Sequence, residues 1–209
     1  MDRLQRQLQF LLEADRVKQV VRQNPLADGS RRENDAEHMW HLALAVLVLA
    51  EHAAEAVDVV RVLTMVLVHD LVEIDTGDVL VYDEVARAAA VEGERAAAER
   101  IFGLLPDDQA SAFREAWEEF EAGRTAEARL AAAVDRLQPM LLNHAAGGGA
   151  WVEHGVSLDA VTARNAQIAE AAPALGETVR SLLADAAERG MLRPGKAGAP
   201  FAPPDEGSP

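Results

Sequence analysis

The sequence contains no cysteine among its 209 residues. Such a chain forms no disulfide and offers no thiolate to a metal ion, so structural zinc sites of the zinc-finger type are excluded. Any metal site must use nitrogen and oxygen ligands. The lack of cysteine also agrees with a reducing compartment, and we expect a cytoplasmic protein.

Long apolar runs are also missing. No uninterrupted apolar stretch is longer than about ten residues, whereas a helix that spans a bilayer needs roughly 20. Residues 1–20 lack the apolar core and the small-residue cleavage site that are typical of a signal peptide. We therefore expect a soluble protein without a membrane partner.

Aromatic residues are scarce, at 4% of the chain, although hydrophobic residues make up 49%. Alanine and leucine are abundant instead, and both favour helix over strand. The sequence predicts a compact, single-domain, all-α protein, because this length suits one sizeable core. Residues 193–209 hold five of the nine prolines and three glycines, so we expect a domain over residues 1–192 followed by a disordered tail.

Positive charge is in short supply, because 20 lysines and arginines stand against 35 acidic residues and the formal net charge is −15. Long-range repulsion would oppose approach to a nucleic-acid polymer or to an anionic membrane, so neither is an expected partner. The deficit is uneven along the chain. Residues 16–32 contain five basic residues and one acid, which makes this segment a local basic patch on an acidic molecule.

Apolar spacing and capping residues predict a succession of helices. Residues 3–22 carry leucines and valines three to four positions apart, which is typical of an amphipathic helix. Asn34 with Glu37 forms a capping-box pattern that opens a second helix, and Asp58 can cap a third over residues 59–75. Further helices are expected over residues 83–105, 107–120, 126–144, 158–172 and 173–190.

One stretch concentrates polar groups at the end of an apolar helix. Residues 59–68 carry a single charged side chain, so apolar residues occupy all faces of this helix and it should lie in the core. His69, Asp70 and Glu73 follow and, at helical spacing, share one sector of the helix. A histidine and an aspartate at the buried end of a helix are rare unless they have hydrogen-bond partners or hold a cation.

His38 and Asp135, on two other predicted helices, could complete a set of two imidazoles and two carboxylates. Nitrogen and oxygen ligands without sulfur suit Mn²⁺, Co²⁺, Fe²⁺, Ni²⁺ or Zn²⁺. The alternative is structural: His69 and Asp70 would form a buried hydrogen-bonded pair, and Asp135 would be a solvated helix acid. Periodicity leaves both open, because straight helices would place His38 and His69 at different heights.

Three local strings together resemble the H…HD…D pattern of HD-domain phosphohydrolases. They are Arg-Arg-Glu-Asn-Asp-Ala-Glu-His (31–38), His-Asp-Leu-Val-Glu-Ile-Asp-Thr-Gly-Asp (69–78) and Val-Asp-Arg-Leu-Gln-Pro (134–139). The resemblance covers roughly residues 5–190 and points to the 5′-deoxynucleotidase branch. It implies a helical HD-domain fold and one divalent metal ion, with Mg²⁺ added to the candidates. The ligands would be His38, His69, Asp70 and Asp135.

The resemblance also implies roles for residues around the metal ion. Asp70 and Glu73 would be catalytic, with Glu73 positioning or activating the attacking water, and Asp78 would contact the sugar hydroxyl. The candidates for binding the phosphate are basic residues of the local patch: Arg22 is the nearest match, and Arg16 or Lys18 could substitute for it. For Arg31 and Arg32, contact with phosphate and simple solvation of the loop are both left open. Contact with substrate or ordinary packing is left open for His41, Asn143, Trp151 and His154.

The expected function is therefore metal-dependent hydrolysis of nucleoside 5′-monophosphates or a similar small phosphate, by attack of a water activated on the ion. Gln23 and Asn24 fall near the position where the bacterial deoxynucleotidases use a tryptophan against the sugar 2′ position, which leaves deoxyribose selectivity open. The alternatives are an HD-type phosphodiesterase, a nucleoside triphosphate hydrolase, or a non-catalytic metal-binding regulatory module. The resemblance also suggests a homodimer.

Overall fold

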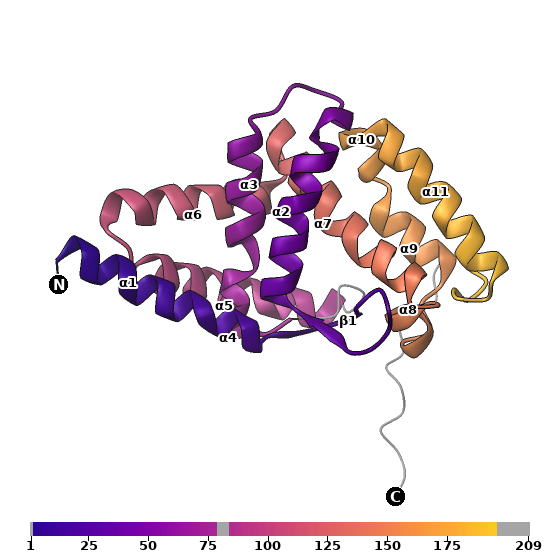
Figure 1. Ribbon diagram of the computed structural model, residues 1–209, viewed down its shortest axis with the longest axis horizontal. Helices are drawn as coiled ribbons and strands as arrows, with labels where there is room; N and C mark the ends of the chain where they lie inside the picture. The colour runs from indigo at the N-terminus through magenta and orange to yellow at the C-terminus, as the bar shows by residue number, and fades with distance from the viewer. Residues whose placement is uncertain (1, 79–83, 196–209) are drawn as a thin grey trace, which may run out of the picture.

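A computed structural model of the protein describes residues 2–78 and 84–195. Helices dominate the described chain, and one small sheet lies near the N-terminal part (Figure 1). The all-α expectation is confirmed, with that two-stranded sheet as an addition. In the described ranges, no helix combines the length and the apolar character that crossing a membrane requires.

The elements follow one another with short connections. The helices are α1 (Arg3–Ala14), α2 (Asp35–Leu49), α3 (Val59–Val68), α4 (Glu73–Thr76), α5 (Glu84–Phe102), α6 (Asp107–Ala122), α7 (Ala126–Ala145), α8 (Gly149–Glu153), α9 (Leu158–Asn165), α10 (Ile168–Ala171) and α11 (Pro173–Glu188). The 3₁₀ turns are η1 (Asp15–Gln19), η2 (Ala50–His52) and η3 (His69–Val72). The antiparallel strands are β1 (Val21–Pro25) and β2 (Arg32–Asn34).

Helix α7 is the central element, with α2, α3 and α6 packed on it toward the N-terminal half and α8, α10 and α11 toward the C-terminal half (Figure 1). Two apolar clusters form the core. One includes Leu42, Met65 and Leu130, and the other includes Leu137 and Trp151. Because α7 contributes residues to both clusters, it connects the N-terminal and C-terminal halves of the core.

The capping predictions are confirmed. The Asn34 side chain accepts a hydrogen bond from the Glu37 backbone N–H at 3.0 Å, and the Glu37 carboxylate accepts one from the Asn34 N–H at 3.2 Å. The side chains of Asp58, Thr125 and Ser157 accept hydrogen bonds from backbone N–H groups in the first turns of α3, α7 and α9. These residues fix the helix starts because they satisfy N–H groups that have no partner inside the helix.

The predicted first helix is too long. It ends at Ala14, and after the turn η1 the chain becomes strand β1, so Arg22 lies on a strand instead of a helix. Val20 and Val21 favour extended backbone because both are β-branched. The Val20 carbonyl also accepts a hydrogen bond from Asp35 N–H at 3.1 Å, which ties this segment to the start of α2.

Helix α1 presents its polar side to the rest of the protein. Arg3 pairs with Asp108 at 2.8 Å and Gln7 donates to Gln109 at 2.7 Å. The leucine row of the predicted amphipathic face is instead exposed, at Leu4, Leu8, Leu11 and Leu12. Phe10 is the one buried residue of the helix.

The predicted helix over residues 59–75 is interrupted. It consists of α3, the 3₁₀ turn η3 and the short helix α4, so the regular spacing ends where His69 begins. The prediction that all faces of residues 59–68 are buried is also wrong, because Val60 is 71% and Leu67 is 47% exposed. The outer face of α3 is therefore apolar and open to solvent.

The C-terminal part differs from prediction in two places. The helix expected over residues 158–172 is two helices, α9 and α10. Arg193, placed in the predicted tail, belongs to the fold, since its N–H donates to Val156 O at 2.9 Å and its carbonyl accepts from Leu158 N–H at 3.0 Å. The rest of that predicted tail, residues 196–209, lies outside the described residues.

Candidate metal centre

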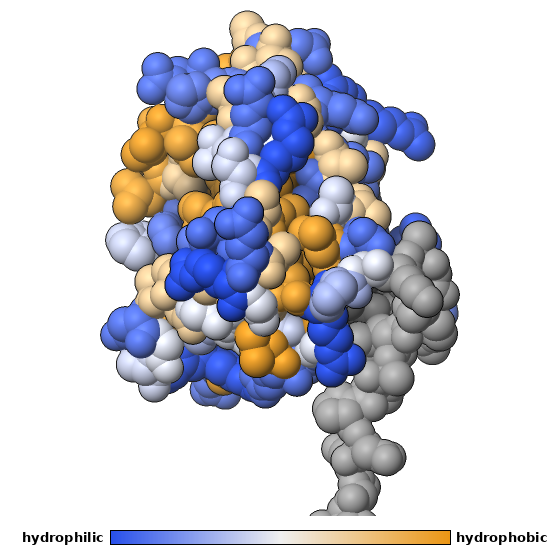
Figure 2. Space-filling model, turned by 90° about the vertical axis from the view of Figure 1, so that its right-hand side faces the viewer, coloured by the Kyte–Doolittle hydropathy of each residue, from blue (hydrophilic) through white to orange (hydrophobic). Residues whose placement is uncertain are grey.

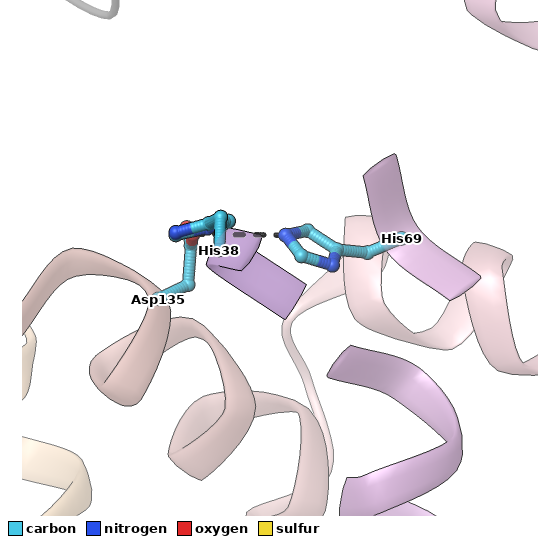
Figure 3. Close-up of side chains that lie close together, drawn as sticks. All are labelled: His38, His69 and Asp135. Carbon is cyan, nitrogen blue, oxygen red and sulfur yellow. Dashed lines mark hydrogen bonds and ion pairs between the residues drawn. The ribbon is translucent and has the colours of Figure 1, made fainter. Parts of the chain in front are cut away.

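Three helical elements bring two imidazoles and a carboxylate together (Figure 3). His38 comes from the first turn of α2, His69 from η3 and Asp135 from α7, and one ligand atom of each lies within 4.8 Å of the others. Asp135 Oδ1 is 3.0 Å from His38 Nε2 and 3.6 Å from His69 Nε2. The side chains that the sequence placed at different heights therefore converge on one point.

Asp70 lies against the same point. Its Oδ1 is 3.1 Å from His69 Nε2, and its Oδ2 is 3.7 Å from His38 Nε2. The 3₁₀ turn that ends α3 carries both His69 and Asp70, so the two consecutive side chains reach one site. All four residues that the family pattern names as ligands are thus close neighbours.

Hydrogen bonds orient both imidazoles with Nε2 toward the centre. His38 Nδ1 is 3.0 Å from Gln138 Oε1, and His69 Nδ1 is 3.1 Å from the carbonyl of Val66. Because each acceptor holds a proton on Nδ1, Nε2 is the nitrogen of each ring that faces the centre and that could bind a cation after losing its own proton. His69 Nε2 is buried and has no hydrogen-bond partner. A buried nitrogen without a partner, beside carboxylates, fits a ligand of a divalent cation.

The electrostatics of the centre favour a cation. Burial opposes ionisation of Asp70 and Asp135, but the two histidines hold the pKa of Asp135 well below its usual value. The histidines and Arg22 together lower the pKa of Asp70 to about 2. Burial likewise lowers the pKa of His69, and the two aspartates outweigh it and raise that pKa to about 10. Two ionised carboxylates in a buried site thus attract positive charge.

A second group of acids adjoins this centre. Oxygen atoms of Asp35, Asp70 and Glu73 lie within 4.8 Å of one another. Arg22 Nη1 is 2.8 Å from both Asp35 Oδ1 and Asp70 Oδ2, and 3.9 Å from Asp78 Oδ1. Burial and the charge of Asp70 raise the pKa of Asp35 to about 6 and raise that of Glu73 well above its usual value. Glu73 is therefore a stronger proton acceptor than an exposed glutamate.

A cavity of about 530 Å³ opens beside the centre. This volume is in the range of small-molecule sites. Arg22, Asp70, Glu73 and Asp78 line one part of it. The remaining wall includes apolar and amide side chains, namely Phe120, Met140, Trp151, Asn24 and Asn143. It also includes charged side chains of both signs, namely Glu94, Glu121, Arg129, Arg136, Arg164 and Glu170.

The other predicted substrate residues lie elsewhere. Lys18 pairs with Asp15 and Arg32 with Glu153, all four are exposed, and neither cation lines this cavity. The interpretation of Lys18 and Arg32 as phosphate ligands is therefore not supported by their positions. Their side chains are held by nearby acids and project from the surface.

The residues whose role was left open lie in different parts of the structure, and only some of them line the cavity. Asn143 and Trp151 line the cavity, and His154 does not. His41 Nδ1 is 3.2 Å from Gln138 Nε2, so it joins the polar network behind the metal centre. Arg16 pairs with Glu13 and lines a smaller cavity of about 310 Å³, together with Glu73 and Asp78.

Sequence reasoning missed the residues that support the ligands. Gln138 and Glu33 are both 2% exposed, and Gln138 Nε2 donates to Glu33 Oε1 at 2.7 Å. Gln138 follows Asp135 by three positions, so helical periodicity places the two on one face of α7. That spacing, inside the string Val-Asp-Arg-Leu-Gln-Pro, was the available signal.

Replacing Gln138 with methionine should weaken metal binding by roughly 10–100-fold, because His38 loses the acceptor that fixes its tautomer. Titration of the metal-free protein with Mn²⁺, followed by calorimetry, measures this change. Gln109→Met makes the same chemical change on α6, away from the centre, and should leave the affinity unaltered. Equal affinities for Gln138→Met and the unaltered protein would show that this hydrogen bond has no such role.

Comparisons with known proteins agree with this geometry. The family model of the HD domain matches residues 14–176. The 5′-deoxynucleotidase HDDC2 of Homo sapiens is 29% identical over 135 residues, and that of Bos taurus is 30% identical over 135 residues. These matches cover 64% of this chain, and 65% and 64% of the two relatives, so the chain spans somewhat less than two thirds of their length.

Two solved structures share the fold. A predicted metal-dependent phosphohydrolase from Magnetospirillum magnetotacticum is 47% identical, with a TM-score of 0.87, over 92% of this chain and 99% of that one. A conserved hypothetical protein from Pyrococcus furiosus is 19% identical, with a TM-score of 0.57, over 87% of this chain and 99% of that one, and shows similarity of fold alone. By the extent of the family match and by its fold, this chain belongs to the HD domain family.

Proposed function

We propose that this protein is a divalent-metal-dependent phosphohydrolase that removes the phosphate from nucleoside 5′-monophosphates. The observation that carries the proposal is the convergence of His38, His69, Asp70 and Asp135 next to a cavity that also contains Arg22 and Glu73. The names of the curated relatives and of the Magnetospirillum protein support the same class of reaction.

A divalent ion held by the four ligands would polarise the phosphoryl group and make water more acidic. The residues of this chain perform the remaining tasks. Arg22 is 8% exposed and kept in place by Asp35 and Asp70, so its guanidinium can stabilise negative charge on the phosphate oxygens. Glu73, with its raised pKa, can accept the proton that the attacking water loses.

The sugar and the base would lie along the remaining wall of the cavity. Asp78 follows Gly77, whose φ of 75° turns the chain at the end of α4, and it can accept a hydrogen bond from a sugar hydroxyl. Phe120 and Trp151 offer aromatic surface to a base. Asn24 lines this cavity and also donates to Pro139 O at 3.4 Å, so a polar amide borders the sugar region.

Phosphate release from a panel of substrates tests this function. With Mn²⁺, Co²⁺ or Mg²⁺ added, deoxy- and ribonucleoside 5′-monophosphates should be hydrolysed with kcat/KM values within about tenfold of each other, because an amide beside the sugar does not exclude a hydroxyl group. Nucleoside triphosphates and cyclic nucleotides should be much poorer substrates. If cyclic nucleotides have the highest kcat/KM of the panel, the protein is a phosphodiesterase. If nucleoside triphosphates have the highest kcat/KM, it is a triphosphate hydrolase.

A further inference from the structure

The cavity beside the metal centre extends well beyond the four ligands. Along α7 its wall includes residues from Arg129 to Asn143, a length of roughly 20 Å at a rise of about 1.5 Å per residue. Asp135 lies near the middle of this length, so the centre occupies one point of a longer cavity. The proposed hydrolysis uses Arg22 and Glu73, and it leaves the polar groups that α9 and α10 bring to the cavity without a role.

These polar groups come from the C-terminal half of the chain. The last two residues of α9 line the cavity, and so does the residue that directly precedes α10. Helices α9 to α11 lie at the right-hand end of the molecule in Figure 1 and face the viewer in Figure 2, where hydrophilic and hydrophobic residues are mixed. With one residue of α7 they form a part of the cavity that we call the C-terminal wall, and it consists of Arg136, Arg164, Asn165 and Gln167.

Arg136 connects the C-terminal wall to the metal centre. It directly follows Asp135, so the Cα atoms of the two residues are about 3.8 Å apart. Successive residues of a helix are rotated by about 100°, and the Arg136 side chain accordingly points toward the start of α10, where its Nη1 donates to Gln167 Oε1 at 2.6 Å. A single ligand of nucleotide size can therefore contact both the centre and the Arg136 guanidinium.

The charge of Arg136 is not neutralised by the side chains that the structure describes. Arg22 pairs with two aspartates, and Arg129 pairs with Glu55. The partner of Arg136 is instead the uncharged amide of Gln167. Among the described carboxylates, none forms an ion pair with Arg136. A half-buried guanidinium in a cavity wall that is bonded to an amide keeps its charge and further donors for a ligand.

Acids also line this cavity, but they stand on other elements or at the surface. Glu94 belongs to α5 and Glu121 to α6, and Glu170 is exposed on α10. Arg164 adds a second guanidinium to the C-terminal wall. On a molecule with a net charge of −15, long-range forces repel anions, so a second anion is bound only where cations are placed at short range.

We propose that the C-terminal wall binds a second anionic group of the substrate. The substrate class is then a nucleoside 5′-monophosphate that carries a further phosphate or carboxylate on its sugar or base. This inference rests on the proposed hydrolysis and specifies its substrate. The fork of donors on Arg136 matches two oxygen atoms of a phosphate or a carboxylate. The second group takes no part in the reaction, and its contacts hold the nucleotide in place along the cavity.

Isothermal titration calorimetry of the full chain with Mn²⁺ added tests the proposal. The probes are the 5′-methylenephosphonate of uridine, its 3′-phosphate derivative and its 6-carboxylate derivative, in which a C–P bond replaces the ester and prevents hydrolysis. A doubly anionic probe should bind ~10-fold or more tightly than the plain one, because hydrogen bonds to charged groups are worth about that much. The derivative with the larger gain identifies sugar or base as the position of the second group.

Two variants locate the effect. Arg136→Gln should reduce the gain to less than about threefold, because the charge-assisted bonds are lost. Gln167→Glu leaves Arg136 in the protein but places a carboxylate against its guanidinium, and it should reduce the gain in the same way. Arg114→Gln is the matched control, because Arg114 is a cation of α6 that pairs with Glu118 and does not line the cavity. It should retain the full gain.

Equal affinities of the three probes for the unaltered protein would overturn the proposal. So would an undiminished gain in Arg136→Gln and Gln167→Glu proteins whose circular dichroism shows a native helical signal, or loss of the gain in Arg114→Gln. Affinity is measured here and not turnover, so the two proposals can fail separately. A protein that hydrolyses nucleotides without this gain loses the second anion site alone, and one that shows the gain but releases no phosphate loses the proposed hydrolysis.

Discussion

Replacing Asp70 with alanine should abolish both metal retention and phosphate release. Asp70 lies 3.1 Å from His69 Nε2 and 3.7 Å from His38 Nε2, and it also pairs with Arg22 at 2.8 Å. Without this carboxylate the centre loses one ligand and one negative charge, while the positive Arg22 remains beside it. We expect metal affinity to fall by more than the ~10–100-fold that loss of a supporting hydrogen bond costs.

Elemental analysis and phosphate release, both on the purified variant, measure the two effects. Asp185→Ala is the matched control, because Asp185 is an exposed aspartate on α11 that pairs with His144 and Arg189, and it should change neither quantity. Full turnover by folded Asp70→Ala protein would show that the proposed metal centre is not the site of catalysis. Retained metal without turnover would instead mean that Asp70 acts in catalysis and is not needed as a ligand.

Glu73→Gln should lower kcat by about 10²–10⁴-fold while leaving the metal content unchanged. Glu73 lines the cavity beside Asp70 but belongs to the group of acids next to the imidazoles and not to the His38–His69–Asp135 group. The amide keeps the shape of the side chain and removes its capacity to accept a proton. KM should change little if Glu73 acts on water and not on the bound phosphate.

Steady-state kinetics with saturating Mn²⁺ measure kcat and KM separately and so test this prediction. Glu99→Gln makes the same substitution at an exposed position of α5 and should behave as the unaltered protein. An undiminished kcat in Glu73→Gln would show that another group accepts the proton.

The local signals in the sequence predicted the helix starts well. Asn34 and Asp58 cap the helices that they were expected to cap, because a capping bond reaches only two or three residues along the chain. The interruption at His69 and the strand at Arg22 depend on distant parts of the chain. Periodicity carries no information about those parts, so both helices were predicted too long.

Burial was harder to predict than secondary structure. The apolar pattern of α1 indicates an amphipathic helix, but the pattern alone does not say which side faces the protein. Arg3 and Gln7 bind α6, so the leucine row faces outward. An interface with another chain would leave the same pattern in the sequence as a core, and the outer face of α3 was assigned to the core for that reason.

The sequence predicted those residues of the metal centre that belong to the family motif. His38, His69, Asp70 and Asp135 stand in the order that the family pattern gives, and the structure brings them together. Lys18 and Arg32 were chosen by charge and nearness in sequence, and both project from the surface. The supporting Gln138 escaped notice because its role depends on where α2 crosses α7.

The most direct test of the central claim is anomalous X-ray diffraction from crystals grown with Mn²⁺, with data collected on both sides of the manganese absorption edge. The account predicts one strong anomalous peak per chain, within coordination distance of His38 Nε2, His69 Nε2 and carboxylate oxygens of Asp70 and Asp135. A chain that binds no manganese there, or a peak held instead by acids away from the two imidazoles, would contradict it.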